Sequence, residues 1–436
     1  MRVLFTTFAG TGHLHPLVPL ARALAAAGHS VAFAAAPAFC PDVEATGFPC
    51  FPAGLDEPAA GWGSLVSALR DVPPVGDTYT ALFRTHVFGD ILPRHMVPDL
   101  LTLGRTWRPD LIVRDPGEYG GCVAAECLGI PHATGREGPF RSPTAYRELF
   151  GESLDALRRT HGLPPDPEMT MLYRYLGFAW VPPRFLDPAA YVYPVMHFLR
   201  PTPFDRSGAE ALPAWVAGLP ARPTVYATLG TAFNRRPDLF AAIIAALRDE
   251  PVNLVVTVGR DMEPAQFGAL PPNAHVERYI PQTLLFPRCA AVVTHGGFGT
   301  VLSALGHSLP LVVIPIAADQ LVNARRCTAL GVGRAIEPTE VTPGTVREAV
   351  RAVLTEPRYK RQAQRLREEM AALPGPDHAV ALLERLAAER RPMPTASAGG
   401  GRHGRGRSVR ASRSGSWPAV ACGPPRRART PAPPTK

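Results

Sequence analysis

The sequence of 436 residues predicts an α/β protein made of two Rossmann-like domains that face each other across a cleft. Three features support this fold class. Short, wholly apolar runs alternate with Ala- and Leu-rich helical stretches, which is typical of parallel sheets buried on both faces. The alternation starts again after a proline-rich segment at 200–223. The length suits two domains of about 100–200 residues each.

The first half opens with a strand–loop–helix–strand pattern. A helical stretch begins at Pro16 and ends at Gly28, between two apolar runs. The pattern returns around 118–129, where a second helical stretch separates two further runs. Because ligands of such sheets bind beyond the carboxyl ends of the strands, the loops after these runs are candidate sites. The runs expected to form strands are 2–8, 30–36, 110–115 and 130–135.

Two stretches of the first half, 55–105 and 136–190, lack clear periodicity and are rich in Pro, Gly and aromatic residues. We expect loops and irregular helices there, of the kind that surround a site. Their aromatic side chains either line a broad hydrophobic pocket or fill the core, and the sequence leaves both readings open. They are Trp62, Phe83, Phe88, Phe140, Tyr146, Phe150, Tyr173, Tyr175 and Phe178.

The second half repeats the strand–helix rhythm. Its expected strands are 224–229, 253–259, 275–280, 290–295, 310–315 and 333–338, and its expected helices are 236–249, 298–308, 319–330 and the charged stretch 343–391. The predicted organisation is a first domain, a linker, a second domain whose last helices pack back on the first, and a disordered tail rich in Arg, Pro and Gly. The corresponding ranges are 1–205, 206–222, 223–391 and 392–436.

The net charge of +9 comes from the tail. Residues 391–436 hold nine Arg and one Lys without any Asp or Glu, whereas the other 390 residues carry 36 basic and 37 acidic groups. A nearly neutral body gives no reason to expect a nucleic-acid partner or stable membrane insertion. The sequence also has no run of 18 apolar residues and no secretory signal, so we expect a cytoplasmic protein.

The small number of lysines and the spacing of the cysteines and aspartates exclude further classes of chemistry. Lys360 and Lys436 are the only lysines, and neither lies in a phosphate-binding P-loop or a buried site suited to a Schiff base. The seven cysteines form no Cys-x-x-Cys pair, so we expect reduced thiols rather than disulfides or a zinc site. No Asp-x-Asp pair offers a metal site, and we expect neither a metal nor a cofactor.

The loop AGTGHLHP, which follows the first run, places two imidazoles at a strand end. The dinucleotide fingerprint would need glycine where His15 stands, which argues against a nicotinamide or flavin cofactor. His13 is a candidate general base, although a loop histidine is often only structural. Asp115, at the next strand end, is the candidate carboxylate that orients it; Glu118 is the competing candidate, and Asp115 also suits a helix cap.

The turn THGGFGT lies between a buried strand and an apolar helix. Its three glycines let the backbone approach a ligand, and the helix N-terminus offers unpaired N–H groups, so the turn is suited to a diphosphate. His295 and Thr300 add hydrogen-bond donors at its two ends. The glycines are Gly296, Gly297 and Gly299.

Two weaker motifs lie in the same half. The turn LGT places Gly230 and Thr231 after its first strand, where they match a second phosphate-facing turn. Asp319 and Gln320 follow another strand at a helix start. Such a pair either caps the helix or hydrogen-bonds several sugar hydroxyls.

These motifs resemble a family of GT-B fold glycosyltransferases that use nucleotide sugars, in particular the actinobacterial enzymes that glycosylate macrolide, aromatic polyketide and enediyne antibiotics. The most specific part is YIPQTLLFPRCAAVVTHGGFGTVLSALGHSLPLVVIPIAADQLVNARRCTALGVG at 279–333, which combines HGGxGT with DQxxNA. The second match is GTGHLHPLVPLARAL at 10–24. The resemblance covers about 1–390 and leaves out the tail.

The resemblance implies a GT-B architecture and a role for each motif. His13 corresponds to the family's catalytic base and Asp115 to its orienting acid. The pyrophosphate contacts correspond to His295, Gly297 and Thr300. His15 stands where relatives often carry Asn or another residue, which leaves a supporting role for it open.

The remaining donor contacts follow from the same resemblance. Asp319 and Gln320 correspond to the residues that hold sugar hydroxyls, and the YIPQ turn, chiefly Ile280 and Gln282, to the edge of the nucleobase site. An aromatic residue that stacks on the base in many plant relatives is absent from YIPQT, which leaves the choice between a UDP-sugar and a TDP-sugar open.

The implied reaction is an inverting, metal-independent transfer of a hexose or deoxyhexose to a hydroxyl of a hydrophobic aglycone. The expected partners are this small-molecule acceptor and the nucleotide sugar; a homodimer and the identity of the aglycone stay open. Two alternatives are a catalytically silent auxiliary or binding protein of the same fold, and a GT-B enzyme that acts as a nucleotide-sugar epimerase or in cell-wall synthesis.

Overall fold

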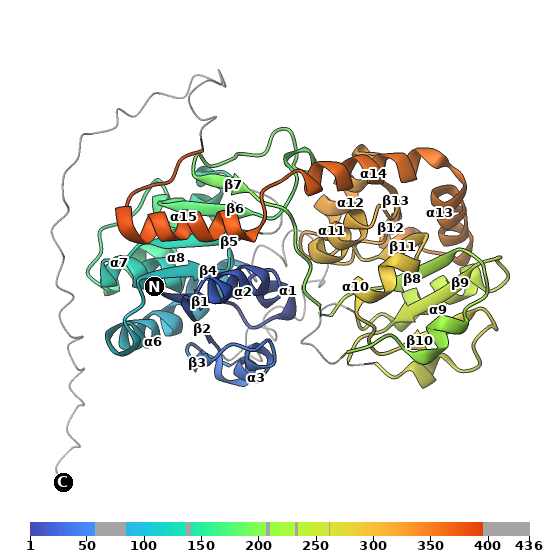
Figure 1. Ribbon diagram of the computed structural model, residues 1–436, viewed down its shortest axis with the longest axis horizontal. Coiled ribbons are helices and arrows are strands. Elements are labelled where there is room, and N and C mark those ends of the chain that lie inside the picture. The colour runs from blue at the N-terminus through green and yellow to red at the C-terminus, as the bar shows by residue number, and fades with distance from the viewer. Residues whose placement is uncertain (57–83, 137–140, 206–209, 232–233, 261, 396–436) are drawn as a thin grey trace, which may run out of the picture.

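The computed structural model describes residues 1–56, 84–136, 141–205, 210–231, 234–260 and 262–395. They form two α/β units that lie side by side, each with a twisted parallel sheet and helices on both faces (Figure 1). The predicted fold class is therefore confirmed.

The first unit contains a parallel sheet of seven strands in the order β3-β2-β1-β4-β5-β6-β7. The strands are β1 (Arg2–Thr6), β2 (Ser30–Ala35), β3 (Cys50–Pro52), β4 (Leu111–Arg114), β5 (His132–Arg136), β6 (Leu176–Ala179) and β7 (Met196–Phe198). Its helices are α1 (Thr11–Leu14), α2 (Val18–Ala26), α3 (Cys40–Glu44), a π-helical stretch Arg84–Ile91, α6 (Leu92–Trp107), α7 (Gly120–Leu128) and α8 (Pro143–Thr160).

Both faces of this sheet are buried. On β1, Leu4 belongs to one apolar cluster, whereas Val3 and Phe5 belong to another on the opposite face, and none of the three is exposed. Because side chains alternate along a strand, a run that is apolar throughout can bury both of its faces only when helices cover the sheet on both sides. This is the physical reason why the wholly apolar runs predict the fold.

The second unit contains a parallel sheet of six strands in the order β10-β9-β8-β11-β12-β13. The strands are β8 (Thr224–Thr228), β9 (Asn253–Thr257), β10 (Ala274–Glu277), β11 (Ala291–Thr294), β12 (Leu311–Val313) and β13 (Gly333–Ala335). The helices are α9 (Pro237–Leu247), α10 (Gln282–Leu285), α11 (Phe298–Gly306), α12 (Gln320–Ala329), α13 (Pro343–Thr355) and α14 (Pro357–Ala371), and the chain continues into α15 (Pro376–Glu389).

The chain returns to the first unit at its last helix. In Figure 1, α14 lies over the second unit and α15 over the first, against α2. Ala379 and Leu383 of α15 are buried in the same apolar cluster as Leu20. The units also meet directly, because Arg326 of α12 donates hydrogen bonds to the carbonyls of Arg184 and Phe185.

The stretch 136–190 is more regular than we expected. It contains the 18-residue helix α8 and the strand β6. The α8 helix has the local signals of a helix start, since Pro143 occupies its first turn and the Ser142 hydroxyl accepts a hydrogen bond from the amide of Ala145. The expectation of loops and irregular helices is wrong here, because the short runs after α8 carry too little periodicity to indicate a strand.

Short 3₁₀ helices connect several elements. They lie at Pro37–Phe39, Thr170–Tyr173, Pro183–Phe185, Ala214–Gly218, Pro264–Phe267, Phe286–Arg288 and Pro338–Glu340. The predicted tail falls outside the described residues from 396 onward. Within the described ranges, no helix has the length and hydropathy needed to cross a membrane.

The expectation that all cysteines are reduced is wrong for one pair. Cys40 and Cys50 form a disulfide, with their Cα atoms 5.4 Å apart. The start of α3 and the start of β3 meet at the edge of the sheet, where β3 pairs with β2, and the spacing in the sequence gave no sign of this contact. Cys122, Cys127, Cys289 and Cys327 are not disulfide-bonded.

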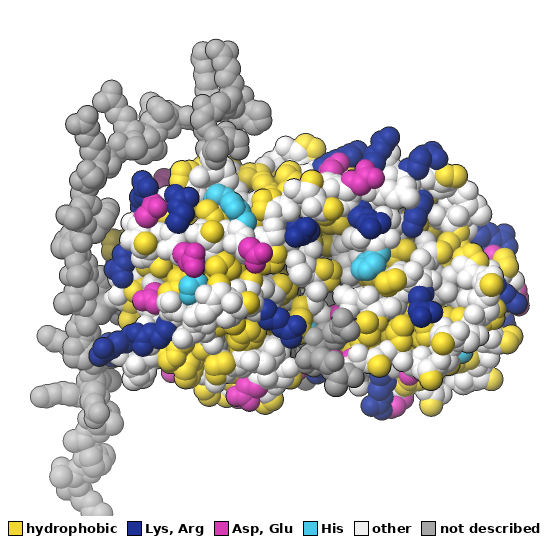
Figure 2. Space-filling view, viewed as in Figure 1, with side chains coloured by type: hydrophobic (Ala, Val, Ile, Leu, Met, Phe, Trp, Pro, Cys, Tyr) yellow, Lys and Arg dark blue, Asp and Glu magenta, His cyan; other side chains and the backbone are white. Residues whose placement is uncertain are grey.

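Charged side chains are distributed over the surface of the two units. On the face that Figure 2 presents, Lys and Arg alternate with Asp and Glu over both units. The exposed ion pair Arg334–Glu348 is an example of opposite charges lying together on the surface. This view therefore agrees with the nearly neutral body calculated from the sequence.

Candidate active site

The first half of the site lies at the carboxyl ends of β1 and β4. These strands are neighbours in register, with Thr6 opposite Arg114, and the amide of Asp115 donates to the carbonyl of Thr6 at 2.8 Å. After β1 the chain turns into the one-turn helix α1, which carries His13. Adjacent strand ends thus bring His13 to Asp115 across 102 residues of sequence.

His13 and Asp115 form a hydrogen-bonded pair. Nδ1 of His13 lies 2.6 Å from Oδ2 of Asp115 and 2.9 Å from Oδ1. The carboxylate is fully buried and also accepts a hydrogen bond from the amide of Gly117 at 2.8 Å, which fixes its orientation. The imidazole side chain is 36% exposed. Because Nδ1 faces the carboxylate, Nε2 is the ring nitrogen available to exchange a proton with a substrate.

Aromatic rings surround the imidazole. Phe8 packs edge-on against His13 with ring centroids 5.1 Å apart, and Phe88 lies parallel to it at 6.3 Å. Phe8 and Phe88 also contact each other. The general base candidate therefore lies in an apolar corner, which suits a hydrophobic acceptor.

A buried arginine that the sequence reasoning missed holds the Asp115 loop. Arg114 is 1% exposed, and its guanidinium donates to the carbonyls of Asp115, Glu118 and Leu172. An arginine at the end of an otherwise apolar strand was the only sequence signal for this role. Its hydrogen bonds to the backbone fix the loop that presents Asp115.

Neither Glu118 nor His15 lies against His13. The carboxylate of Glu118 accepts hydrogen bonds from the Thr6 hydroxyl and from the amide of Gly121, and burial raises its pKa. Asp115, rather than Glu118, is thus the partner of His13. The His15 ring packs edge-on against Phe204 at 5.0 Å, and burial lowers the pKa of His15 to about 4.

The second half of the site lies at the carboxyl ends of β8 and β11, which are also neighbours. Gly230 is the second residue after β8 and has a φ of +79°, and Gly296 is the second residue after β11 and has a φ of +87°. A Cβ on Gly230 would lie 2.5 Å from Nε2 of His295, and a Cβ on Gly297 would lie 2.4 Å from the same atom. Two glycines therefore leave the space that the imidazole of His295 occupies.

His295 is neutral at physiological pH. Burial lowers its pKa to about 4, and Nδ1 lies 3.3 Å from the hydroxyl of Thr294. A buried neutral imidazole can donate one hydrogen bond but contributes no positive charge. The positive potential at this turn comes instead from the N-terminus of α11, whose cap residue Gly297 has no side chain to satisfy the first amides.

The hydroxyl of Thr300 faces the YIPQ turn. Nε2 of Gln282 lies 3.4 Å from Oγ1 of Thr300 and 3.5 Å from the hydroxyl of Tyr226. The Ile280 side chain is 1% exposed, so only the backbone of Ile280 can contact a ligand. The turn thus joins the first turn of α11 through Gln282.

Asp319 and Gln320 stand at the start of α12, which Asn323 joins to the glycine turn. Oε1 of Gln320 accepts hydrogen bonds from the amides of Ile316 and Ala317. The side-chain nitrogen of Gln320 is therefore the atom left to contact a ligand, and it does so as a donor. Asn323 bridges Oδ2 of Asp319, at 3.1 Å, and the carbonyl of Gly296, at 2.9 Å. Asn323 belongs to the DQxxNA motif, but its structural role as a bridge is apparent only in the fold.

Two further predicted donor residues are accessible. Thr231 and Gly299 are exposed at their turns. The first unit reaches the phosphate turn through Phe185, whose ring packs edge-on against Phe298 with centroids 5.7 Å apart. The contact places the glycine turn next to the first unit.

Most of the described aromatic residues of the irregular stretches fill the core. Tyr146, Phe150 and Tyr173 are at most 6% exposed and pack in one buried cluster, and Phe178 is buried on the other face of the sheet. Phe88 is the member that contacts His13. Trp62, Phe83 and Phe140 lie outside the described residues.

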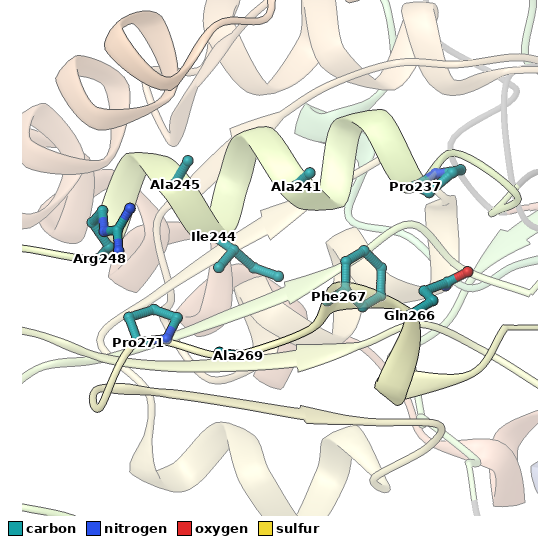
Figure 3. Close-up of a pocket in the computed structure, with 9 residues that line it drawn as sticks. All are labelled: Pro237, Ala241, Ile244, Ala245, Arg248, Gln266, Phe267, Ala269 and Pro271. Carbon is teal, nitrogen blue, oxygen red and sulfur yellow. The ribbon is translucent and has the colours of Figure 1, made fainter.

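A surface groove in the second unit lies apart from these residues. It has a volume of about 370 Å³ between the outer face of α9 and the segment 264–271, with Ile244 and Phe267 among its lining residues (Figure 3). Arg248 stands at one end, and no residue of the strand-end loops lines it. The groove therefore adds nothing to the candidate active site.

Known proteins match both halves of the chain. Residues 22–166 match the N-terminal domain, and residues 241–386 the C-terminal domain, of the erythromycin biosynthesis protein CIII-like family. The 3-alpha-mycarosylerythronolide B desosaminyl transferase of Saccharopolyspora erythraea is 30% identical over 421 residues, which cover 90% of this chain and 99% of that protein. The chain belongs to this family. It is a nucleotide-sugar-dependent glycosyltransferase.

Further relatives and solved structures support the assignment. The L-demethylnoviosyl transferase of Streptomyces niveus is 34% identical over 410 residues, covering 90% of this glycosyltransferase and 99% of the relative. The glycosyltransferase VinC in complex with dTDP superimposes with a TM-score of 0.73 at 28% identity, covering 89% of this chain and 100% of VinC. SnogD from Streptomyces nogalater gives 0.73 at 27% identity, covering 89% and 99%. The fold is thus GT-B.

Proposed function

We propose that this glycosyltransferase moves a sugar from a thymidine-diphosphate sugar to a hydroxyl of a hydrophobic natural-product aglycone, with inversion at the anomeric carbon and without a metal ion. The observation that carries the proposal is the His13–Asp115 pair, in which a buried carboxylate orients an accessible imidazole at 2.6 Å. The glycine turn beside the first unit supplies the diphosphate site.

The proposed reaction begins at His13. Asp115 holds Nδ1, so Nε2 takes the proton from the acceptor hydroxyl as its oxygen attacks the anomeric carbon. The bond between that carbon and the diphosphate oxygen breaks, and its electron pair leaves with the nucleoside diphosphate. Attack from the face opposite the leaving group inverts the anomeric configuration.

The leaving group is stabilised by the second unit. The amides at the start of α11, the hydroxyl of Thr300 and a neutral hydrogen bond from His295 would face the departing phosphate oxygens. Among the described residues, no three His, Cys, Asp or Glu side chains group as metal ligands. In the proposed mechanism the helix amides take the place that a divalent cation has in other nucleotide-sugar enzymes.

The sugar hydroxyls are assigned to the start of α12. Asp319, held by Asn323 at 3.1 Å, offers carboxylate acceptors, and Gln320 offers an amide donor. Relatives named for desosamine, mycaminose and daunosamine transfer indicate a deoxysugar donor. The dTDP in VinC and the thymidine diphosphate in SsfS6 favour thymidine over uridine.

The aglycone class rests on two kinds of support. Phe8 and Phe88 make the surroundings of His13 apolar. The printed names of the relatives include acceptors such as 10-deoxymethynolide and aklavinone. We therefore assign a polyketide-like acceptor.

The test is mass spectrometry of products after the purified protein is offered a panel of TDP- and UDP-sugars with candidate aglycones. We expect a mass increase of one sugar with at least one TDP-sugar, unchanged by chelation with EDTA, and inversion in the NMR spectrum of the product. Retention of configuration or loss of activity in EDTA would contradict the mechanism. A protein that binds TDP but neither transfers nor hydrolyses any sugar would support the auxiliary role instead.

A further inference from the structure

The segment that leaves the first unit carries two residues with opposite attachments. Phe204 faces the first unit, and Asp205, the next residue, faces the second. The Phe204 ring packs edge-on against His15 at 5.0 Å and lies 4.7 Å from the guanidinium carbon of Arg22. Since His15 ends the one-turn helix α1, which carries His13, Phe204 packs directly against the loop of the proposed base.

Asp205 is bound to the YIPQ turn. Its Oδ2 accepts a hydrogen bond from the amide of Thr283, and its Oδ1 accepts one from the Thr283 hydroxyl, both at 2.7 Å. The carbonyl of Asp205 also accepts a hydrogen bond from the Tyr279 hydroxyl. Three hydrogen bonds therefore attach Asp205 to Tyr279 and Thr283, at the two ends of the turn.

The turn needs a partner of this kind. The α10 helix has four residues, and its cap residue is Pro281, which has no side chain able to accept from the first amides. Asp205 supplies the missing carboxylate from outside the helix, as an N-cap side chain normally does from within. Without it, the amide of Thr283 loses its acceptor and α10 loses the group that fixes its start.

Gln282, which lies between Pro281 and Thr283, connects α10 to the donor site. Gln282 begins α10 and reaches Oγ1 of Thr300 at 3.4 Å, in the first turn of α11. A shift of α10 therefore moves both Gln282 and the backbone of Ile280. These are the groups that the family resemblance assigns to the edge of the nucleobase site.

We propose that Phe204 and Asp205, here called the linker clamp, are positioning residues that hold the donor turn and the base loop in one fixed arrangement. The inference rests on the proposed function, because it takes the YIPQ turn as part of the nucleotide site. It goes beyond that function because it makes the affinity for the nucleotide depend on the packing of Phe204 against His15 and Arg22, which lies wholly in the first unit.

The first test is calorimetric titration with thymidine diphosphate, which needs no acceptor. For Asp205→Ala we expect the Kd to rise about 3- to 30-fold, the range for removal of a capping side chain. Asp205→Asn retains an amide oxygen for Thr283, so it should recover most of this loss. The matched control is Asp187→Ala, which removes an exposed carboxylate that accepts one local amide at 2.8 Å and should leave the Kd unchanged.

The second test separates a clamp from a local cap. Phe204→Ala removes contacts to His15, Arg22 and the apolar cluster that covers one face of the first sheet. A clamp predicts that it also weakens binding of thymidine diphosphate by at least about 3-fold. The double variant Phe204→Ala/Asp205→Ala should then be little worse than Asp205→Ala, because the two residues act as a unit. Thr283→Val, which removes one hydrogen bond, provides a milder probe should Asp205→Ala not fold.

Each outcome decides between the readings. Wild-type Kd values for folded Asp205→Ala and Thr283→Val would overturn the clamp entirely. A weakened Asp205→Ala beside a wild-type Kd for Phe204→Ala would overturn the coupling and leave only a local cap. Failure of the wild-type protein to bind thymidine diphosphate would instead count against the proposed function.

Discussion

Gly297→Ala is the substitution for which the structure gives the sharpest expectation. Gly297 has a φ of −58° and a ψ of 133°, a backbone conformation that alanine adopts without strain. The added Cβ would, however, lie 2.4 Å from Nε2 of His295, far inside van der Waals contact. The same edge of the ring also faces Gly230, where an added Cβ would lie 2.5 Å from the same nitrogen, so the ring sits closely against both glycine turns. The ring must therefore leave its position.

The loss should appear in donor binding rather than in folding. A displaced His295 cannot donate to the diphosphate, and a hydrogen bond to a charged group contributes about 1.5–3 kcal/mol. We therefore expect the Kd for thymidine diphosphate to rise about 10- to 150-fold in calorimetric titration. Because the overpacked residue is the ring itself, His295→Ala/Gly297→Ala should bind no more weakly than His295→Ala alone.

The control lies in the same helix. Gly306→Ala, at the other end of α11, would meet only the methyl group of Met370 at 3.9 Å, an ordinary contact, and alanine favours the helix. This variant should bind thymidine diphosphate as the wild type does. A folded Gly297→Ala protein with wild-type affinity would refute the assignment of His295 to the diphosphate.

Three further predictions concern the base, the pH dependence of stability and the tail. His13→Ala should abolish sugar transfer, and Asp115→Asn should reduce kcat about 10²- to 10⁴-fold, while calorimetry finds thymidine diphosphate binding intact in both; unchanged turnover of His13→Ala would remove His13 from its role. Burial holds the pKa of His295 at about 4 against 6.5 in the unfolded chain, so the unfolded state takes up a proton first. The contribution of His295 to the free energy of unfolding, measured in urea, should therefore be complete above about pH 6.5 and be lost as the pH drops towards 4. The free energy of unfolding of His295→Gln should fall less steeply with pH over this range. An identical pH dependence in the two proteins would contradict the neutral buried imidazole. A chain that ends at Thr395 keeps the buried Met393, whose amide donates to the carbonyl of Tyr175. It should retain full transfer activity in the product assay, and loss of transfer would give the tail a role.

The sequence predicted the fold class and most strands because its strands are wholly apolar. Only a sheet covered on both faces can bury such runs, so Val3 and Phe5 with Leu4 between them indicate a doubly wound sheet before any contact is known. The same reasoning fails for β7, a three-residue strand at the sheet edge, and for β6, because such short runs carry no periodicity of their own. Their place is determined by the neighbouring strands.

The candidate site was predictable as far as local chemistry goes. A glycine-rich turn between a strand and a helix, and polar residues directly after strands, are visible in the printed sequence. Partnerships between distant segments are not. The choice of Asp115 over Glu118, the disulfide between Cys40 and Cys50, and the attachment of Asp205 to Thr283 each join segments whose distance in the chain carries no information about their distance in space.

The sequence by itself thus determined the two sheets, the loops at their carboxyl ends and the residue types that those loops present. The tertiary structure decided which of these residues meet. Strand order places β1 beside β4 and β8 beside β11, and this alone brings His13 to Asp115 and Gly230 to His295. The physical reason is that hydrophobic periodicity reports burial of one segment at a time, whereas strand pairing depends on the packing of all segments together.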